Sequence, residues 1–392
     1  MPATLSRKSR CRGPPDTDTQ TQPQPEPPPP EQTLAGGKAP GRTRTLKIDA
    51  KEVCPGEPTL VVAEVGVNHD GSVNKALELV RIAKNCGADA VKLQVFRAVN
   101  LLHPSCALAE YQKSRTQAND AMDMLRRYEL TGEEMTRVER AIRELKMIPL
   151  ATPFSPSDMD IIDRLRLPAV KIASPDLVNR PLLAAAQKLG KPLLVSTGAS
   201  TLDEIDASVG WLRAWGTSFA LLHCVSGYPT PPKYANLCWI DELSRRFNVP
   251  VGYSDHTTGI AAGALAAAAG ALIIEKHLTF DRDARGPDHA VSSDPNQFER
   301  YVKQIREADV LRGCPGKQVL DIELDALKVS RQSLVLRRSI KAGEAIREED
   351  LTVQRPGTGL PASMIDRAVG RKAARLLPAG SLLQWDMLAD AA

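Results

Sequence analysis

Eight short apolar segments, each followed by a stretch of helical periodicity, succeed one another between residues 60 and 313. The stretch VNKALELVRIAKNCG (73–87), for example, repeats apolar residues at helical spacing and ends at a glycine. Strands that alternate with helices pair in parallel through right-handed crossovers. Eight such units predict a (β/α)8 TIM barrel, an α/β fold. The predicted strands are LVVAEV (60–65), DAVKLQ (89–94), MIPLAT (147–152), AVKIAS (169–174), PLLVST (192–197), FALLHC (219–224), VPVGYS (249–254) and ALIIEK (271–276).

A doubly wound open sheet is the alternative fold, but no G-x-G-x-x-G follows the first predicted strand. We therefore expect a barrel over residues 47–313, a linker over 314–332 and a small β-rich domain over 333–392. The last domain contains an internal echo, because SIKAGEAIREEDL (339–351) resembles LLPAGSLLQWDML (376–388). The aligned pairs are Gly343 with Gly380, Ile346 with Leu383, and Leu351 with Leu388.

Residues 1–46 form a proline-rich tail with too few apolar side chains to pack, so we expect this tail to be disordered. Residues 1–47 hold eight Lys/Arg and four Asp/Glu, which accounts for the whole net charge of +4. The remaining chain is formally neutral, and we expect no nucleic-acid partner. An organelle transit peptide remains an alternative interpretation of the tail.

No uninterrupted apolar run of about 18 residues occurs, so the sequence predicts no membrane span. The seven cysteines are scattered and include no C-x-x-C pair. This pattern favours free thiols in a reducing compartment, and it argues against a disulfide scaffold or a structural zinc site. We expect a cytoplasmic protein.

The carboxyl ends of the predicted strands carry polar side chains, and in a barrel these ends converge on one mouth. Lys92 and Lys171 lie within apolar strands, where an unpaired ammonium group is very costly. Two cations with hydroxyl groups beside them predict a socket for a dianion such as a phosphate, and structural ion pairing is the alternative. The polar strand-end residues are Glu64, Lys92, Gln94, Thr152, Lys171, Ser174, Ser196, Thr197, Ser226, Tyr228, Ser254, His256, Glu275 and His277.

Two histidines end neighbouring predicted strands, His256 in YSDH and His277 in EKH. Adjacent parallel strands lie about 4.8 Å apart, so both imidazoles can reach one divalent cation. Asp255, Glu275 and Asp288 are close in sequence and are left open as further ligands. With two firm nitrogen ligands, the site suits an exchangeable Mn²⁺, Mg²⁺ or Co²⁺ better than a closed zinc cage. A buried structural role for the histidines is the alternative.

Seven blocks follow one another along the chain: AEVGVNHDG, GADAVKLQ, KIASPDL, STGAS, YPTPP, VPVGYSDHTTGI and IEKHLTFDRDARGPDHA. Together they resemble the sialic acid synthase (N-acetylneuraminate synthase) family. The end of the chain, with SIKAGEAIREEDLTVQRPGTG, resembles that family's C-terminal antifreeze-like (SAF) domain. The resemblance extends over residues 58–390, with the blocks in the family's order.

The resemblance implies an enzyme that condenses phosphoenolpyruvate with an N-acetylated hexosamine aldehyde. The products would be a nine-carbon 2-keto sugar acid and phosphate. It also implies that His256 and His277 hold the metal, which polarises the sugar aldehyde as a Lewis acid. Glu64 matches an acidic residue that handles a water or hydroxyl proton. The residues that match the phosphoenolpyruvate cradle are Lys92, Thr152, Lys171, Ser174, Ser196 and Ser254.

On the sugar side, the resemblance implies contacts from Tyr228 and Asp288. Arg355 matches an arginine that the small domain extends to the acylamino group in a partner subunit, which implies a domain-swapped homodimer. Ser226 stands where bacterial members often carry asparagine, so its sugar contact is open. The proline in KIASPDL, at a position where glycine is frequent, also bears on the choice of sugar.

Three other interpretations compete with this one. Barrels that make 3-deoxy-keto acids from phosphoenolpyruvate are the nearest, and the paired histidines and the C-terminal segment argue against them. A pure binding protein is disfavoured by the complete set of lysines and histidines at the strand ends. A metal-dependent hydrolase would need more carboxylate or imidazole ligands than the sequence places at this mouth. The sugar itself is left open among N-acetylmannosamine, its 6-phosphate and diacetamido sugars that lead to legionaminic- or pseudaminic-type acids.

Overall fold

The computed structural model divides the chain into two compact units, residues 1–314 and 315–392. The predicted tail lies outside the described residues as far as residue 43. Among the described residues, no helix combines the length and the apolar character that a membrane span requires, and five cysteines, from Cys54 to Cys238, are free. The structure describes residues 44–103, 105–106, 120–313 and 316–389.

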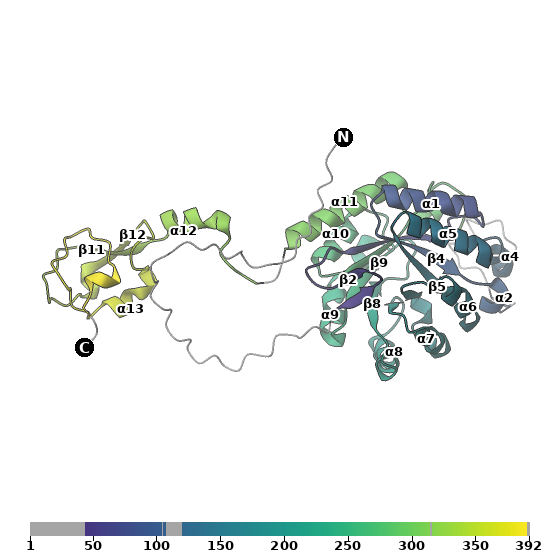
Figure 1. The fold of residues 1–392 in the computed structure, drawn as a ribbon, viewed down its shortest axis with the longest axis horizontal. Helices are drawn as coiled ribbons and strands as arrows, with labels where there is room; N and C mark the ends of the chain where they lie inside the picture. Colours follow the sequence, from purple (N-terminus) through teal and green to yellow (C-terminus); the bar gives the residue numbers. More distant parts are fainter. Residues whose placement is uncertain (1–43, 104, 107–119, 314–315, 390–392) are drawn as a thin grey trace. The chain divides into compact units, whose positions relative to one another are not determined.

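The first unit contains a closed barrel of parallel strands in the order β10-β3-β4-β5-β6-β7-β8-β9 (Figure 1). This architecture confirms the predicted TIM barrel, and each predicted strand coincides with an observed one to within a few residues. The closed order excludes the doubly wound open sheet. The barrel strands are β3 Leu60–Gly66, β4 Ala90–Val95, β5 Ile148–Pro153, β6 Val170–Ile172, β7 Leu193–Ser196, β8 Phe219–Cys224, β9 Val251–Asp255 and β10 Ile273–His277.

Helices surround the strands on the outside of the barrel (Figure 1). Several begin at a side-chain cap, since Thr131 and Thr201 each form a reciprocal capping box with a glutamate three residues later. Apolar side chains of the helices and of the outward-facing strand positions form the main core. The helices of this unit are α1 Val73–Asn85, α2 Ala98–Leu101, α4 Ala121–Arg126, α5 Gly132–Glu144, α6 Met159–Arg164, α7 Arg180–Gln187, α8 Leu202–Ala214, α9 Cys238–Phe247, α10 Ala261–Ala268 and α11 Pro295–Arg312.

A short hairpin, β1 Leu46–Ile48 with β2 Lys51–Val53, packs against the interior of the barrel near the amino ends of its strands. Its apolar side chains are buried with inward-facing residues such as Leu60 and Val62. The hairpin was missed at the sequence level, where the boundary at residue 47 falls inside β1. By filling this end, it leaves the carboxyl ends of the strands as the open face.

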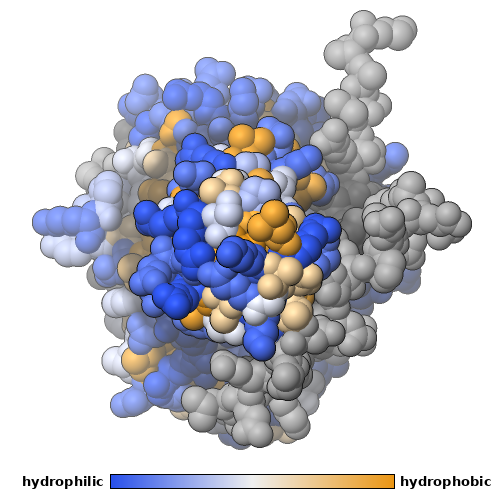
Figure 2. Space-filling view, turned by 90° about the vertical axis from the view of Figure 1, so that its left-hand side faces the viewer, coloured by the Kyte–Doolittle hydropathy of each residue, from blue (hydrophilic) through white to orange (hydrophobic). Residues whose placement is uncertain are grey.

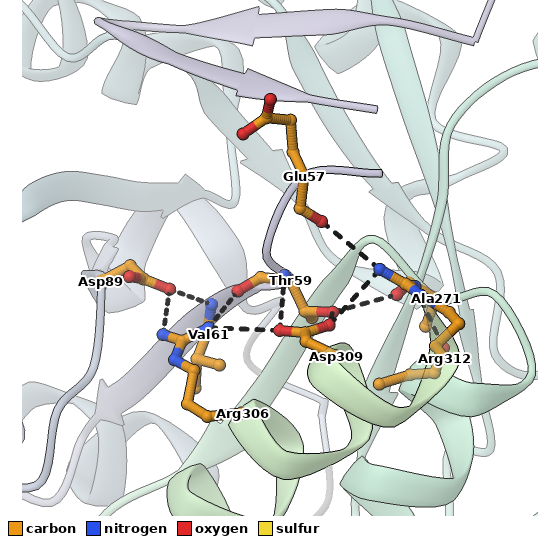
Figure 3. A network of polar contacts seen from close by, with 9 residues as sticks. Glu57, Thr59, Val61, Asp89, Ala271, Arg306, Asp309 and Arg312 are labelled. Atoms are coloured by element: carbon orange, nitrogen blue, oxygen red, sulfur yellow. Dashed lines mark hydrogen bonds and ion pairs between the residues drawn. The ribbon is translucent and has the colours of Figure 1, made fainter. Parts of the chain in front are cut away.

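A polar network fastens α11 to the amino ends of β3 and β4 (Figure 3). Asp309 accepts hydrogen bonds from the backbone N–H and the hydroxyl group of Thr59, at 2.9 and 2.6 Å. Arg306 donates to the Thr59 carbonyl oxygen and to the Asp89 carboxylate. Arg312 donates to the carbonyl oxygen of Glu57. The network therefore holds the closed barrel at the end opposite the predicted site.

In the second unit, β11 Ser333–Leu336 pairs with β12 Leu351–Gln354 as antiparallel strands. The two similar segments of this unit also have similar backbone conformations. Gly343 in the first and Gly380 in the second adopt positive φ angles of 78° and 82°. Each glycine precedes a buried aliphatic residue and a single 3-10 turn, at Glu348–Asp350 and at Trp385–Met387. The second unit is β-rich, as predicted.

The second unit also contains two short helices, α12 Leu324–Ser330 and α13 Ile365–Ala368. Helix α12 falls in the segment that the sequence predicts to be a linker.

The face drawn in Figure 2 is mostly hydrophilic, with small hydrophobic areas between charged ones. Such scattered apolar exposure is ordinary for a protein surface.

Candidate active site

A cavity of about 250 Å³ opens at the carboxyl ends of the barrel strands. The structure brings together here most of the site residues that the sequence predicts, although their roles remain predictions. Ser226 is exposed and does not line the cavity. Arg355 is an exposed residue of the second unit. The predicted residues that line the cavity are Glu64, Lys92, Thr152, Lys171, Ser174, Ser196, Tyr228, Ser254, His256, His277 and Asp288.

Lys92 is paired with two carboxylates, one on the neighbouring strand β3 and one on β10, the strand beyond it. Its Nζ lies 3.0 Å from Glu64 Oε2 and 3.1 Å from Glu275 Oε2, and all three side chains are buried. Burial favours the neutral amine, but Glu275 and Glu64 together raise the pKa of Lys92 above its ordinary value. Lys92 is therefore a fixed positive charge at the bottom of the cavity.

Lys171 is less completely paired than Lys92. Its Nζ lies 3.8 Å from Glu275 Oε1 and donates a hydrogen bond to the Ile172 carbonyl oxygen at 3.1 Å. Burial lowers the pKa of Lys171 to about 8, although Glu275 opposes this effect. Glu275 therefore neutralises the charge of Lys171 only in part, and this charge could attract a bound anion.

Glu275 connects the two lysines, a role that the sequence did not predict. Besides both ammonium groups, its carboxylate accepts a hydrogen bond from Ser254 Oγ at 2.9 Å. Burial opposes ionisation, but Lys171 and Lys92 hold the pKa of Glu275 well below its ordinary value. The sequence did place Glu275 at a strand end, but its pairing with lysines on β4 and β6 depends on the closed barrel.

Glu64 differs from Glu275, because burial raises its pKa to about 7 even though Lys92 opposes this effect. Its Oε1 accepts a hydrogen bond from Gln94 Nε2 at 3.1 Å. A carboxyl group with a pKa near neutrality exchanges a proton readily, which is what a general acid or base requires. When Glu64 is protonated, Lys92, Lys171 and Glu275 together carry one net positive charge.

Three hydroxyl side chains lie beside these charges. Thr152 Oγ1 and Ser196 Oγ are buried and have no hydrogen-bond partner among the residues that the structure describes. Ser174 Oγ accepts a hydrogen bond from the Gly198 N–H at 3.0 Å. A Cβ atom at Gly198 would lie 2.9 Å from Ser174 Oγ and 2.4 Å from Ser226 Oγ, so only glycine permits this approach. The cations and hydroxyls thus lie together, as the predicted socket for an anion such as a phosphate requires.

The ring centroids of His256 and His277 lie 5.7 Å apart. His256 Nδ1 lies 2.9 Å from the Val225 carbonyl oxygen, which can only accept, so Nδ1 carries a proton and, in the neutral ring, Nε2 is the nitrogen with a lone pair for a cation. His277 Nδ1 is buried and has no hydrogen-bond partner within the described part of the chain. The ring of Tyr228 packs against His256 at 4.2 Å. Two imidazoles with such nitrogens fit a divalent cation whose other ligands are water or substrate.

The sequence left Asp255 and Glu275 open as further metal ligands, and the structure gives both carboxylates other partners. Asp255 is paired with Lys276, and Glu275 with the two cavity lysines. Within the described residues, His, Cys, Asp and Glu side chains form no group of three that could hold a metal ion. Among the residues that the structure describes, His256 and His277 are therefore the two nitrogen ligands that the predicted site offers.

Asp288 is placed by a clamp between the loops that follow β3 and β10. Ser292 Oγ donates to the Asp288 carbonyl oxygen at 2.6 Å and accepts from Asn68 Nδ2 at 2.8 Å. The neighbouring His289 pairs with Asp70 at 2.9 Å. The clamp was missed because its partners are more than 200 residues apart in the chain.

Apolar side chains line another part of the cavity, and sequence reasoning missed them because several come from the helices after β4. Phe96 and Phe154 meet edge to face, with ring centroids 6.1 Å apart. Such a lining accommodates methyl groups of a ligand better than it accommodates charge. The residues of this apolar wall are Val67, Phe96, Leu101, Met124, Leu125, Phe154 and Pro287.

Comparison with known proteins gives the relatives of this chain. The model of the NeuB family matches residues 79–317, and the SAF domain model matches residues 331–389. An N,N'-diacetyllegionaminic acid synthase of Legionella pneumophila is 37% identical over 83% of this chain and 93% of its own length. The N-acetylneuraminate-9-phosphate synthase of Homo sapiens is 29% identical over 82% of this chain and 92% of its own length. A solved N-acetylneuraminic acid (sialic acid) synthetase from Leptospira borgpetersenii aligns with a TM-score of 0.66 and 28% identity, covering 73% of this chain and 95% of that one.

Proposed function

Because this chain belongs to the NeuB family and carries an SAF domain, we propose that it condenses phosphoenolpyruvate with an acylamino sugar aldehyde. The methylene carbon of phosphoenolpyruvate forms a bond to the aldehyde carbon, whose oxygen gains a proton. Water adds to the former enol carbon, and phosphate leaves. The products are a nine-carbon 2-keto sugar acid, N-acetylneuraminate or an analogue, and inorganic phosphate.

The observation that carries this proposal is the convergence of Lys92 and Lys171 on Glu275, beside the buried hydroxyls of Thr152 and Ser196. A phosphate and a carboxylate on one small molecule need several donors at fixed positions, and these side chains supply them. Because the lysines lie on β4 and β6, closure of the barrel fixes their separation. Phosphoenolpyruvate would therefore be held in one orientation.

His256 and His277 would hold a divalent cation such as Mn²⁺ on the sugar side of the cavity. When bound, the cation supplies Lewis-acid polarisation of the aldehyde. The Val225 carbonyl oxygen fixes the tautomer of His256, and the ring of Tyr228 restricts its rotation. Glu64, with a pKa of about 7, is the group that gives or takes the proton of the water or hydroxyl.

The apolar wall favours one class of sugar, a 2,4-diacetamido-trideoxy sugar that leads to a legionaminic- or pseudaminic-type acid. Such a sugar carries a methyl group in place of a hydroxymethyl group and a second N-acetyl methyl group. Phe96, Met124 and Leu125 supply apolar contact for these methyl groups. The legionaminic acid synthase of Legionella pneumophila is also more similar to this chain than the human enzyme is.

A comparison of sugars tests this choice. Sugar-dependent release of phosphate from phosphoenolpyruvate should give a higher kcat/KM with the diacetamido-trideoxy sugar than with N-acetylmannosamine or its 6-phosphate. One apolar group in a fitted pocket is worth roughly 10-fold or more. Leu125→Asn, at a half-buried position, should reduce this preference, whereas Leu125→Met should keep it. Equal kcat/KM for all three sugars would contradict the proposed preference of the apolar wall.

We further propose that the enzyme works as a homodimer in which Arg355 of one subunit reaches the acylamino group at the site of the other. Arg355 is exposed and directly follows β12. A guanidinium group presents several donors in one plane, which suits an amide carbonyl and a sugar hydroxyl.

A further inference from the structure

A buried ion pair lies directly behind the two cavity histidines. Asp255 and Lys276 precede His256 and His277 in the chain, and successive side chains of a strand point to opposite faces. The histidines line the cavity, so the ion pair faces the surrounding helices. Lys276 Nζ lies 2.9 Å from Asp255 Oδ2, and both side chains are at most 1% exposed.

Tyr301 of α11 completes this cluster. Its hydroxyl group donates a hydrogen bond to Asp255 Oδ2 at 2.8 Å, and Lys276 Nζ lies 5.1 Å from the centre of its ring. Gly263 of α10 makes room for the ring, because a Cβ atom there would lie 2.4 Å from Tyr301 Cζ. Two helices and two strands therefore meet at one buried polar cluster.

The cluster also holds the backbone on both sides of His256. Asp255 Oδ1 accepts a hydrogen bond from the Thr257 N–H at 2.8 Å. Lys276 Nζ donates to the Thr257 carbonyl oxygen at 2.5 Å. Residues 255–257 are thereby tied to the residue that precedes His277. The position of one histidine relative to the other depends on these contacts.

Stability alone does not explain an ion pair at this place. The desolvation of two buried charges roughly offsets their attraction, and well-packed apolar residues of similar volume often stabilise a core as much or more. The register of β9 and β10 is already set by their ladder, in which Asp255 lies opposite Lys276. The charged pair adds hydrogen bonds to the backbone N–H and carbonyl oxygen of Thr257, the residue that follows His256.

We propose that Asp255, Lys276 and Tyr301 are positioning residues that set the geometry of His256 and His277 and thereby the affinity of this pair for a divalent cation. None of the three lines the cavity, so each acts through the histidines. The inference rests on the proposed function only in assigning the cation to these histidines.

Tyr301→Phe is the sharpest test, because it removes one hydrogen bond and keeps the ring. Mn²⁺ binding to the metal-free protein is measured by electron paramagnetic resonance of free Mn²⁺, without any turnover. Loss of a group that orients a metal ligand typically weakens binding by roughly 10–100-fold. We expect a loss on this scale, with an unchanged dissociation constant for phosphoenolpyruvate. The double variant Asp255→Asn/Lys276→Met, which leaves no unpaired charge, should behave in the same way.

Asp309→Asn is the matched control. It lies on the same helix and weakens buried hydrogen bonds to Thr59 at the opposite end of the barrel (Figure 3). It should lower the melting temperature at least as much as Tyr301→Phe and leave Mn²⁺ affinity unchanged. Wild-type Mn²⁺ affinity in both cluster variants, or an equal loss in Asp309→Asn, would overturn the inference. Absence of condensation by a wild-type protein that binds Mn²⁺ at His256 and His277 would contradict the proposed function and leave this inference standing.

Discussion

Lys171 Nζ lies 3.8 Å from Glu275 Oε1, beyond hydrogen-bond distance. The same carboxylate binds Lys92 at 3.1 Å. Burial lowers the pKa of Lys171 to about 8, because this looser pairing with Glu275 offsets the effect of burial only in part, whereas the pKa of Lys92 is raised. Of the two lysines, Lys171 is therefore the one whose charge a bound anion would change.

Binding of phosphoenolpyruvate should take up a proton above pH 8, because the anion favours the charged form of Lys171 and raises its pKa. Affinity should fall as the pH rises through 8 toward 9.5, because Lys171 loses its proton over this range. Calorimetry at pH 8.5 in two buffers of different ionisation enthalpy measures the uptake. Binding that is independent of pH and of buffer over this range would contradict the predicted role of Lys171.

Lys171→Met and Lys92→Met should differ in their effect on stability. Removal of Lys92 leaves Glu64 and Glu275 without their closest cation, which costs about 3–5 kcal/mol for a buried pair. Removal of Lys171 leaves Glu275 paired, so the fold should persist while phosphoenolpyruvate binding weakens by roughly 10–100-fold. Thermal melting and calorimetric titration of both variants test this, and equal losses of stability would count against the assignment.

His256→Ala and His277→Ala should each reduce the condensation rate severely and leave phosphoenolpyruvate binding nearly intact, because both lysines and the unpaired hydroxyls of the anion socket lie on β4 to β7. Excess chelator should abolish turnover, and added Mn²⁺ should restore it. The control is phosphoenolpyruvate binding in the presence of chelator, which should persist. Undiminished turnover in excess chelator would refute the role of a divalent cation.

Arg355→Ala should raise the KM for the sugar or lower kcat by roughly 10–100-fold, the scale of one lost charge-assisted hydrogen bond. If Arg355 acts in the partner subunit, mixing Arg355→Ala with Lys171→Ala should restore part of the activity. The mixed dimer then contains one intact barrel facing one intact arginine. Heterodimers that form without regaining activity would show that the arginine acts within its own chain or has no role in the site.

The barrel and the location of its mouth could be predicted because apolar runs and helical periodicity are local properties of a sequence. Lys92 and Lys171 could be identified because a lysine inside an apolar strand is unusual, whatever position that strand takes in the fold. The hairpin β1–β2 could not be predicted in this way, because strands of three residues give no measurable period.

The pairing within the site depends on three-dimensional contacts that no local pattern reveals. Glu275 meets lysines from two other strands only after the barrel closes. Asp255 was left open as a metal ligand because the sequence gives no partner for it, while the structure pairs it with Lys276 on the outer side of the strands. The apolar wall was missed because its helices contribute short segments that resemble ordinary core.

The most direct test of the proposed condensation is the mass of the product. The enzyme is incubated with Mn²⁺, phosphoenolpyruvate and, in turn, N-acetylmannosamine, its 6-phosphate and a 2,4-diacetamido-trideoxy sugar, and the mixtures are analysed by mass spectrometry. We predict a keto acid with the mass of one sugar plus pyruvic acid, formed together with an equal amount of phosphate, and no such acid when pyruvate replaces phosphoenolpyruvate. A folded enzyme that binds phosphoenolpyruvate and yields this product with none of the acylamino sugars would contradict the account.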